Sequence, residues 1–507
     1  MDKHNILIIM ADQLAPHFLG AYGHKVARTP HIDSLAKIGT RFDAAYCNSP
    51  LCAPSRFAFM TSQHISRIGA YDNASELKAS IPTFAHYLNS LGYRTCLSGK
   101  MHFIGPDQKH GFKERITTDI YPSDFAWTPN WEKASMRIDK WYHNMQTVKE
   151  SGEAIATFQT DYDDEVEFAA QRWLIDRGRD RRSGNASPFC LVASFIHPHD
   201  PYVAMPEWWN KFSDHEIDLP KVMFSPDNQD PFSRRIMDGI EASHTTISEA
   251  EIRKARRAYY ANVSYFDSKV GALIKTLRDI DELDNTIVFI TADHGDMLGE
   301  RGLWYKMTFF ENSSRVPLIV TGPNIRHGTV NNACSLIDIL PTLIEIGGGN
   351  KNTYGEKIDG RSLLPLAYGK ADPVDEAIAE YCAEMTPWPI FMIRRGIFKY
   401  IHCEIDPPQL FNLADDPLEL TNLANDENYN DVCQSFADEV SQRWNSSKIR
   451  EAVIESQRSR QKLQNAMNLN PDDHWDYNPP SNASSQYVRN HMDWTLAAAR
   501  YRFPPLK

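Results

Sequence analysis

The residue that most clearly indicates a chemical activity in this sequence is Cys52, which begins the segment Cys-Ala-Pro-Ser-Arg at residues 52–56. A cysteine in the pattern C-x-P-S-R can be oxidised by maturing enzymes to formylglycine, an aldehyde that no encoded side chain supplies. One hydroxyl of the hydrated aldehyde can attack a sulfuryl or phosphoryl centre, and the other can then expel the product, a step that serine and cysteine lack. The alternative is a free cysteine beside a proline-containing turn, because so short a pattern also recurs by chance. The interpretation therefore depends on the other residues of such a site.

Three residues could supply ligands for a divalent cation: Asp12, Asp293 and His294. Together with oxygens from position 52 and the substrate, they could hold one ion, which would lower the pKa of the diol hydroxyl and neutralise substrate oxygens. A set made mostly of oxygens favours calcium or magnesium, and the imidazole nitrogen also allows manganese. The alternatives are a helix N-cap for Asp12 and a simple turn at Asp293.

A set of basic residues could bind the oxygens of the transferred group, because fixed cations stabilise the charge that develops there. Its members are Arg56, Lys100, His102, His199 and Lys306. Lys100 and His102 are two residues apart on an extended segment, so they face the same side. Their roles stay open: His102 could be the base that releases the product, and His199 or Lys306 the acid that protonates the leaving group.

Strand and helix patterns alternate along the first part of the chain. We expect buried strands at residues 5–10, 93–97, 190–196, 286–291 and 317–321, and helices at residues 30–38, 83–92, 251–278 and 335–346. This alternation is typical of an α/β domain with a mixed, mainly parallel sheet flanked by helices. Several predicted strands end at the residues named above, and ligands gather at the carboxyl ends of strands in such sheets. The sequence therefore predicts one shared site.

The pattern changes towards the C-terminus. Residues 391–394 and 397–402 predict a β-hairpin, the segment from residue 409 predicts a further strand and turn, and residues 434–444 predict a helix. We therefore expect a catalytic domain at 1–374, a smaller antiparallel α+β subdomain at 375–467 and a C-terminal arm at 468–507. The arm is polar but holds six aromatic residues, which a disordered tail seldom carries. We expect it to pack on its own body or on a neighbouring subunit.

Composition excludes several classes of protein. The 507 residues are 42% hydrophobic and 24% charged, an ordinary globular composition, and the formal net charge of -12 argues against a general nucleic-acid binder. The apolar N-terminal run is too short to span a bilayer and lacks the features of a signal peptide, and no later segment resembles a membrane span. Eight scattered cysteines are typical of reduced thiols. We expect a cytoplasmic protein without nucleic-acid or membrane partners.

Taken together, these motifs resemble those of type I sulfatases, the formylglycine-dependent group of the alkaline-phosphatase-like superfamily, and within that group the choline-sulfatases. The resemblance runs nearly end to end, through residues 5–13, 49–56, 98–103, 197–202, 293–306, 416–423 and 487–492. It implies an alkaline-phosphatase-like fold and formylglycine at position 52, made by a formylglycine-generating or sulfatase-maturing enzyme. It also implies a calcium-type metal held by residue 52, Asp12, Asp293 and His294, with the basic set around the sulfate.

Three positions depart from the family pattern. Gln13 stands where many sulfatases have a second aspartate, and His294 stands where many have asparagine, so manganese and magnesium remain alternatives to calcium. Ser62 follows Thr61 where many maturation motifs have glycine, so the conversion of Cys52 is an inference.

The same resemblance implies a substrate, choline-O-sulfate, whose quaternary ammonium cannot donate hydrogen bonds. A selective pocket would therefore use aromatic faces and a carboxylate. The candidate substrate-binding residues are Asn73, Trp127 and His143, which lie in segments shared with choline-sulfatases, and Glu384 and Asp493 as partners of the cation. The alternative for Trp127, as for Trp388, is packing in the core. If the arm completes a neighbour's pocket, the protein is a homo-oligomer, a dimer or tetramer.

The expected function is hydrolysis of a sulfate ester, choline-O-sulfate to choline and sulfate. An arylsulfatase or a phosphonate or phosphodiester monoesterase on the same scaffold is the first alternative, because the nucleophile and metal do not separate these activities. The second alternative is an inactive binding protein that keeps the fold.

Overall fold

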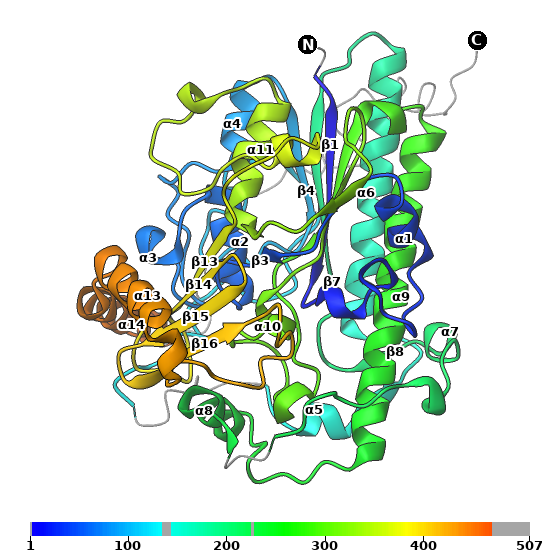
Figure 1. Cartoon of the computed structure of the whole chain (residues 1–507). Coiled ribbons are helices and arrows are strands. Elements are labelled where there is room, and N and C mark those ends of the chain that lie inside the picture. Colours follow the sequence, from blue (N-terminus) through cyan, green and yellow to red (C-terminus); the bar gives the residue numbers. More distant parts are fainter. Residues whose placement is uncertain (1–2, 134–142, 225–227, 469–507) are drawn as a thin grey trace.

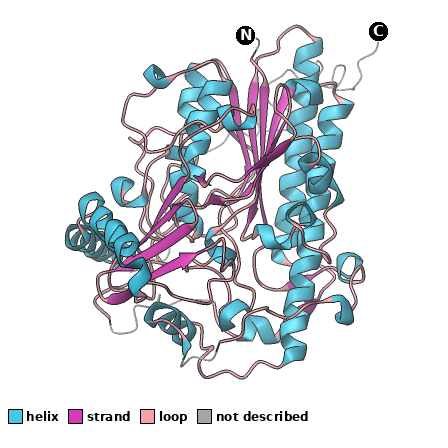
Figure 2. Cartoon of the chain, viewed as in Figure 1, coloured by secondary structure: helices cyan, strands magenta, loops and turns pink. Residues whose placement is uncertain are grey.

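The computed structural model describes residues 3–133, 143–224 and 228–468, and within these ranges the central feature is an eight-stranded mixed sheet (Figures 1 and 2). Its strands lie in the order β11-β2-β10-β9-β1-β7-β4-β5. β1 pairs in parallel with β7 and β9, β4 pairs in parallel with β7, and β10 runs antiparallel to β9 and β2. The strands are β1 (Asn5–Asp12), β2 (Thr40–Phe42), β4 (Arg94–Gly99), β5 (Glu114–Arg115), β7 (Phe189–Pro198), β9 (Thr286–Ala292), β10 (Leu318–Thr321) and β11 (Gly328–Val330).

Helices cover both faces of this sheet, which is why its central strands are mostly apolar (Figure 1). Every residue of β1, β7 and β9 is buried. One face is covered by α1 (Pro30–Ala36), α6 (Phe158–Arg182) and α9 (Glu249–Asp279), and the other by α2 (Cys52–Thr61), α4 (Phe84–Ser90) and α11 (Ile339–Ile346). The mixed, mainly parallel sheet flanked by helices that the sequence predicts is confirmed.

A second, antiparallel sheet lies beside the first and consists of β13 (Glu376–Tyr381), β14 (Ile390–Arg395), β15 (Phe398–Cys403) and β16 (Asp406–Asn412) in that order. The predicted hairpin is β14 and β15, which turn at Gly396 with a φ of 57°. Two helices, α13 (Asn430–Arg443) and α14 (Ser446–Asn468), pack against this sheet (Figure 1). The smaller antiparallel unit is thus present, whereas all but the first residue of the predicted arm lies outside the described residues.

Helices α6 and α14 are absent from the expectations drawn from the sequence. Helix α6 is strongly charged and buries only a narrow stripe that includes Tyr162, Val166, Ala170 and Trp173, and α14 is largely polar. Helix α9, by contrast, is predictable from the sequence, because Ser248 and Glu251 form a reciprocal capping box at its start. The shorter elements are α3 (Ile65–Ile68), α5 (Gln146–Lys149), α7 (Pro206–Trp209), α8 (Pro231–Gly239), α10 (Glu311–Ser314), α12 (Leu364–Ala367), β3 (Ala45–Tyr46), β6 (Gly152–Glu153), β8 (Val203–Ala204) and β12 (Cys334–Ser335).

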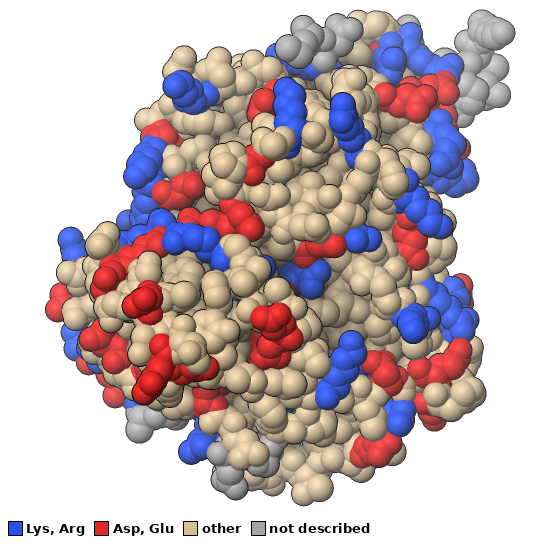
Figure 3. Space-filling model, in the orientation of Figure 1, with Lys and Arg blue, Asp and Glu red and all other residues tan. Residues whose placement is uncertain are grey.

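The distribution of surface charge and the state of the cysteines agree with what the composition indicates. Acidic and basic side chains are interspersed over the face shown in Figure 3. All eight cysteines are free thiols, and Cys433 alone among them is partly exposed. Within the described ranges, no helix combines the length and the apolar character needed to cross a membrane.

Candidate functional site

The candidate residues meet where the parallel strands of the large sheet end. Asp12 is the last residue of β1, Asp293 and His294 follow β9, and Lys100 follows β4. Cys52 is the first residue of α2, whose ten residues are all buried. Because the carboxyl ends of parallel strands share one edge, side chains far apart in the sequence come together there.

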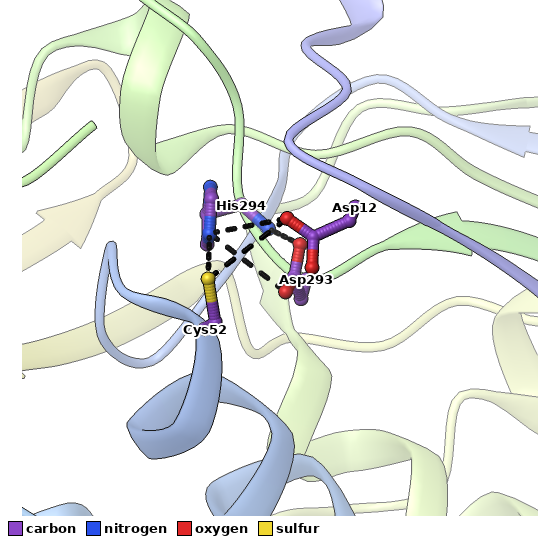
Figure 4. A group of neighbouring side chains, drawn as sticks. All are labelled: Asp12, Cys52, Asp293 and His294. Atoms are coloured by element: carbon purple, nitrogen blue, oxygen red, sulfur yellow. Dashed lines mark hydrogen bonds and ion pairs between the residues drawn. The ribbon is translucent and has the colours of Figure 1, made fainter. Parts of the chain in front are cut away.

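Four of these side chains form a group that could hold a metal ion (Figure 4). Cys52 Sγ lies 3.2 Å from His294 Nε2 and 3.9 Å from Asp12 Oδ1, and His294 Nε2 lies 3.7 Å from Asp293 Oδ2. The four possible ligand atoms are buried and lie within 4.8 Å of one another. His294 Nδ1 lies 3.0 Å from the carbonyl oxygen of Gly295, so Nδ1 donates there and leaves Nε2 free as a ligand. Two carboxylates, an imidazole nitrogen and residue 52 fit one divalent cation.

Arg56 binds the carboxylates of both Asp12 and Asp293. Its Nε donates to Asp293 Oδ2 at 2.8 Å, and one terminal nitrogen donates to Asp12 Oδ2 at 2.9 Å. The other terminal nitrogen donates to the Lys100 carbonyl oxygen at 2.7 Å and to Ser194 Oγ at 2.8 Å. All three of its nitrogens therefore bind neighbouring groups of the protein.

Lys100 shares the Asp12 carboxylate with Arg56, because its ammonium group also donates to Asp12 Oδ2. Burial favours the neutral form of Asp12, but Lys100, His199 and Arg56 hold its pKa well below the usual range. Gly99, which precedes Lys100, allows the end of β4 to lie close to β7: its φ is +104°, and a Cβ there would lie 1.9 Å from the Ser194 carbonyl oxygen.

Lys306 is hydrogen-bonded to both Gln13 and His199. The ammonium of Lys306 donates to Gln13 Oε1 at 2.6 Å and to His199 Nε2 at 2.7 Å. Burial opposes the charge on Lys306, but Cys52, Asp200 and Asp12 raise its pKa, so it stays protonated. The Gln13 amide nitrogen donates to Asp296 Oδ2 at 2.7 Å. Gln13 thus bridges Lys306 and Asp296, which explains why an amide, with a donor and an acceptor, suits this position.

An aromatic wall borders the site on the side of His102. The His102 ring lies 5.3 Å from the Tyr121 ring and 5.9 Å from the Trp127 ring, and Lys100 Nζ lies 4.4 Å from the Tyr121 centroid. Burial and the charge of Lys100 lower the pKa of His102 well below its usual value, so the imidazole is neutral. Trp127 is half-buried at this wall, whereas Trp388 packs against Arg450 of α14.

The other candidate substrate-binding residues surround this core. Asn73 Oδ1 accepts a hydrogen bond from the Ala53 backbone N–H at 3.0 Å, directly beside position 52. His143 Nε2 lies 3.5 Å from Asp200 Oδ1, and its ring lies 6.0 Å from the His199 ring. Asp493 lies outside the described residues.

Glu384 is a buried carboxyl group with one unsatisfied oxygen. Its side chain is 1% exposed, and Oε2 has no hydrogen-bond partner among the described residues. Burial and the charge of Asp72 raise its pKa to about 7, while Lys306 opposes this shift. An unpaired carboxylate in such surroundings is costly unless a cation reaches it.

Several neighbours of the site were not among the predicted site residues. Asp200 and Asp296 lie in the segments that follow the predicted strands at 190–196 and 286–291, so the same signal could have found them. Tyr121 lies in an irregular segment and Asp72 in a turn, where hydrophobic periodicity gives no signal.

Comparison with known families decides the class of protein. The family model described as "Sulfatase" matches residues 4–349, more than half of the chain. The chain belongs to the sulfatase family. The remainder of this sulfatase is matched by "N-sulphoglucosamine sulphohydrolase, C-terminal" at residues 299–446 and "Choline sulfatase enzyme C terminal" at residues 451–503.

Individual relatives agree with this assignment. The sulfatase is 45% identical over 506 residues to the choline-sulfatase of Rhizobium meliloti (strain 1021), with 99% of each chain covered. It is 29% identical over 466 residues to arylsulfatase K of Danio rerio, which covers 86% of this chain and 82% of that protein. The solved phosphonate monoester hydrolase of Agrobacterium radiobacter has the same fold, with a TM-score of 0.69, 22% identity, and coverage of 87% of this chain and 95% of that one.

The protein is therefore a sulfuric ester hydrolase. Sulfatases in general use a divalent metal and formylglycine, and the group of Asp12, Cys52, Asp293 and His294 provides a possible metal site in this chain.

Proposed function

We propose that this sulfatase hydrolyses choline-O-sulfate to choline and sulfate. The similarity to choline-sulfatase over the whole chain supports this substrate, as does the match of its C-terminal part to the choline-sulfatase C-terminal model. The structural observation that carries the proposal is Glu384, a buried carboxyl group with a free oxygen that lies within electrostatic reach of Lys306. A quaternary ammonium that donates no hydrogen bonds suits this carboxylate and the face of Trp127, whose ring lies 5.9 Å from the His102 ring.

We further propose that Asp12, Asp293, His294 and residue 52 hold one divalent ion, calcium, with manganese or magnesium as alternatives. When bound, the ion would supply positive charge that acidifies the hydrated aldehyde at position 52 and neutralises sulfate oxygens. The formylglycine itself would come from Cys52 through a formylglycine-generating or sulfatase-maturing enzyme.

The roles of the basic residues follow from their partners. Arg56 orients Asp12 and Asp293, and Lys100 and Arg56 keep Asp12 ionised. Lys306 is protonated and hydrogen-bonded to His199, so this pair can place positive charge and a proton near the leaving oxygen. His102 is neutral, and both ring nitrogens lack hydrogen-bond partners among the described residues, so it can accept a proton when the product is released.

Two further predictions concern the setting of the enzyme. We propose that the arm at 468–507, with Asp493, takes part in a homo-oligomer, a dimer or tetramer. The eight free thiols support a reducing compartment such as the cytoplasm.

Hydrolysis of choline sulfate and 4-nitrophenyl sulfate, measured as sulfate release, and of an aryl phosphonate monoester, measured as release of the phenol, tests the proposal. The enzyme should be matured and metal-loaded, with conversion of Cys52 checked by peptide mass spectrometry. We expect kcat/KM for choline sulfate to exceed the other values by about 100-fold, the effect of some 3 kcal/mol of recognition of the cation. A preference for the aryl sulfate would favour an arylsulfatase, and a preference for the phosphonate would favour a phosphonate monoesterase. No turnover of any substrate by converted enzyme would favour a binding protein.

A further inference from the structure

One face of α14 contacts the loop that carries Trp127. Gln457 Oε1 accepts a hydrogen bond from the Trp131 backbone N–H at 2.9 Å, and Gln464 Oε1 accepts one from the Phe125 backbone N–H at 2.9 Å. Between them, Gln461 Nε2 donates to the Pro129 carbonyl oxygen at 3.1 Å. These glutamines recur at helical spacing, so one side of the helix binds the backbone of the loop along its length.

Arg460 lies at the centre of this face and makes a buried, bidentate ion pair with Asp72. The two terminal nitrogens lie 2.6 and 2.7 Å from the two carboxylate oxygens, and one of them lies 3.2 Å from Thr128 Oγ1. The side chains of Arg460 and Asp72 are 7% and 0% exposed. A planar fork that binds both carboxylate oxygens fixes the orientation as well as the distance of its partner.

The partners of α14 are the chain neighbours of the proposed choline-binding residues. Asp72 precedes Asn73 and accepts a hydrogen bond from the Ala74 N–H at 3.0 Å, which holds the turn in which Asn73 lies. Thr128 follows Trp127.

The same helix reaches Glu384 through a third connection. Trp131, whose backbone is held by Gln457, donates from its indole Nε1 to the Ala383 carbonyl oxygen at 2.7 Å, and Ala383 precedes Glu384. Val453 of α14 packs in the same buried apolar cluster as Trp131 and Tyr71. Three separate segments of the site are thus tied to one helix.

The sulfate end of the site is built differently. Asp12, Arg56 and Lys100 are bound to one another and to the ends of the central strands. The family model "Choline sulfatase enzyme C terminal" begins at residue 451 and so includes Arg460, whereas the other two family models end before it.

We propose that Arg460 is a positioning residue that sets substrate preference: through Asp72 and the loop at 125–131 it holds the surface that receives the quaternary ammonium. This inference rests on the proposed function. Loss of the guanidinium would leave Asp72 buried without its partner and release the turn and the loop, whereas Asp12, Arg56 and Lys100 would keep their contacts with one another.

A matched pair of arginines on α14 tests the proposal. Arg458 forms a bidentate pair with Glu132 of the neighbouring segment at 2.7 and 2.5 Å, but these side chains are 60% and 45% exposed. Matured, metal-loaded wild type, Arg460→Ala and Arg458→Ala are compared on choline sulfate and 4-nitrophenyl sulfate. In Arg460→Ala we expect KM for choline sulfate to rise about 10- to 100-fold, with kcat/KM for the aryl sulfate within about threefold of wild type. Arg458→Ala should match wild type on both substrates.

Arg460→Lys provides the second measurement, and it takes the place of Arg460→Ala if that variant does not fold. The ammonium keeps the charge but cannot bind both carboxylate oxygens as a planar fork, so KM for choline sulfate should be intermediate. Equal losses on both substrates, or the same KM change in Arg458→Ala, would overturn the positioning role. Wild-type enzyme that does not hydrolyse choline sulfate would overturn the proposed function and this inference together, so the two failures are distinct.

Discussion

The substitution Glu384→Gln removes an ionisable group and keeps the shape of the side chain. In the folded, ligand-free protein the pKa of Glu384 is raised to about 7 from an ordinary value of 4.5, first by burial and then by Asp72. A carboxyl group with a raised pKa binds its proton more tightly in the folded than in the unfolded chain. It therefore contributes stability at low pH, and this stability is lost as the pH rises from the unfolded value through about 7.

The change in unfolding free energy follows from the raised pKa of Glu384. At roughly 1.4 kcal/mol per pKa unit, ionised Glu384 costs about 3 kcal/mol of unfolding free energy at pH 8. About 1 kcal/mol of that cost is already present at pH 5.5, because the unfolded carboxyl is ionised there. The difference in stability between Glu384→Gln and wild type should therefore grow by about 2 kcal/mol, in favour of the variant, between pH 5.5 and pH 8.

Urea unfolding of both proteins at the two pH values, with the same metal content, measures this difference directly. Comparison within each pH cancels the titration of all other groups. Glu455→Gln on α14 is the matched control, because Glu455 is exposed, and it should show no pH-dependent difference. Added choline at pH 8 should stabilise wild type more than Glu384→Gln, because only the wild type offers a carboxylate to the cation.

A stability difference that is the same at pH 5.5 and pH 8 would refute the reasoning, since it would mean that Glu384 ionises as it does in water. Equal stabilisation of both proteins by choline would show that the cation binds elsewhere. The kinetic counterpart is a fall of about 100-fold in kcat/KM for choline sulfate in Glu384→Gln, with aryl sulfate turnover nearly unchanged.

Three other substitutions test the rest of the site. Cys52→Ala should abolish sulfate release from every substrate and keep the circular dichroism spectrum of the wild type; appreciable turnover would contradict the nucleophile. Asp293→Asn should lose bound metal by elemental analysis and about 3 kcal/mol of unfolding free energy, because Arg56 loses an ion partner; full metal content would contradict the ligand set. Trp127→Ala should lower kcat/KM for choline sulfate at least about tenfold and that for aryl sulfate much less; equal losses would favour a packing role for the indole.

The strands and the sulfate end of the site could be predicted from the sequence for a physical reason. Strands buried on both faces are continuous apolar runs, and in a parallel sheet their carboxyl ends coincide. Asp12, Lys100 and Asp293 could therefore be placed together from chain position alone. The register of β1 with β7 and β9 gives this coincidence its geometric basis.

The choline end could not be predicted in the same way. Arg460 and Asp72 are separated by 388 positions, and neither lies in an apolar pattern that marks an element end. Helix α14 is largely polar, and its contacts with the turn and the loop are made by glutamine and arginine side chains. The hydrogen bonds of Gln13 with Lys306 and Asp296 could not be predicted either, because a sequence can indicate which residues surround a site but not which donor pairs with which acceptor.

The burial of α2 limits when Cys52 can be oxidised to formylglycine. Cys52 is 1% exposed, and the helix that it begins has no exposed residue. A maturing enzyme that must bind the chain around this thiol cannot reach it once the sheet and helices have folded. Oxidation of Cys52 must therefore take place before folding is complete. A host that synthesises the protein faster than it oxidises Cys52 would therefore accumulate molecules that are correctly folded but unconverted.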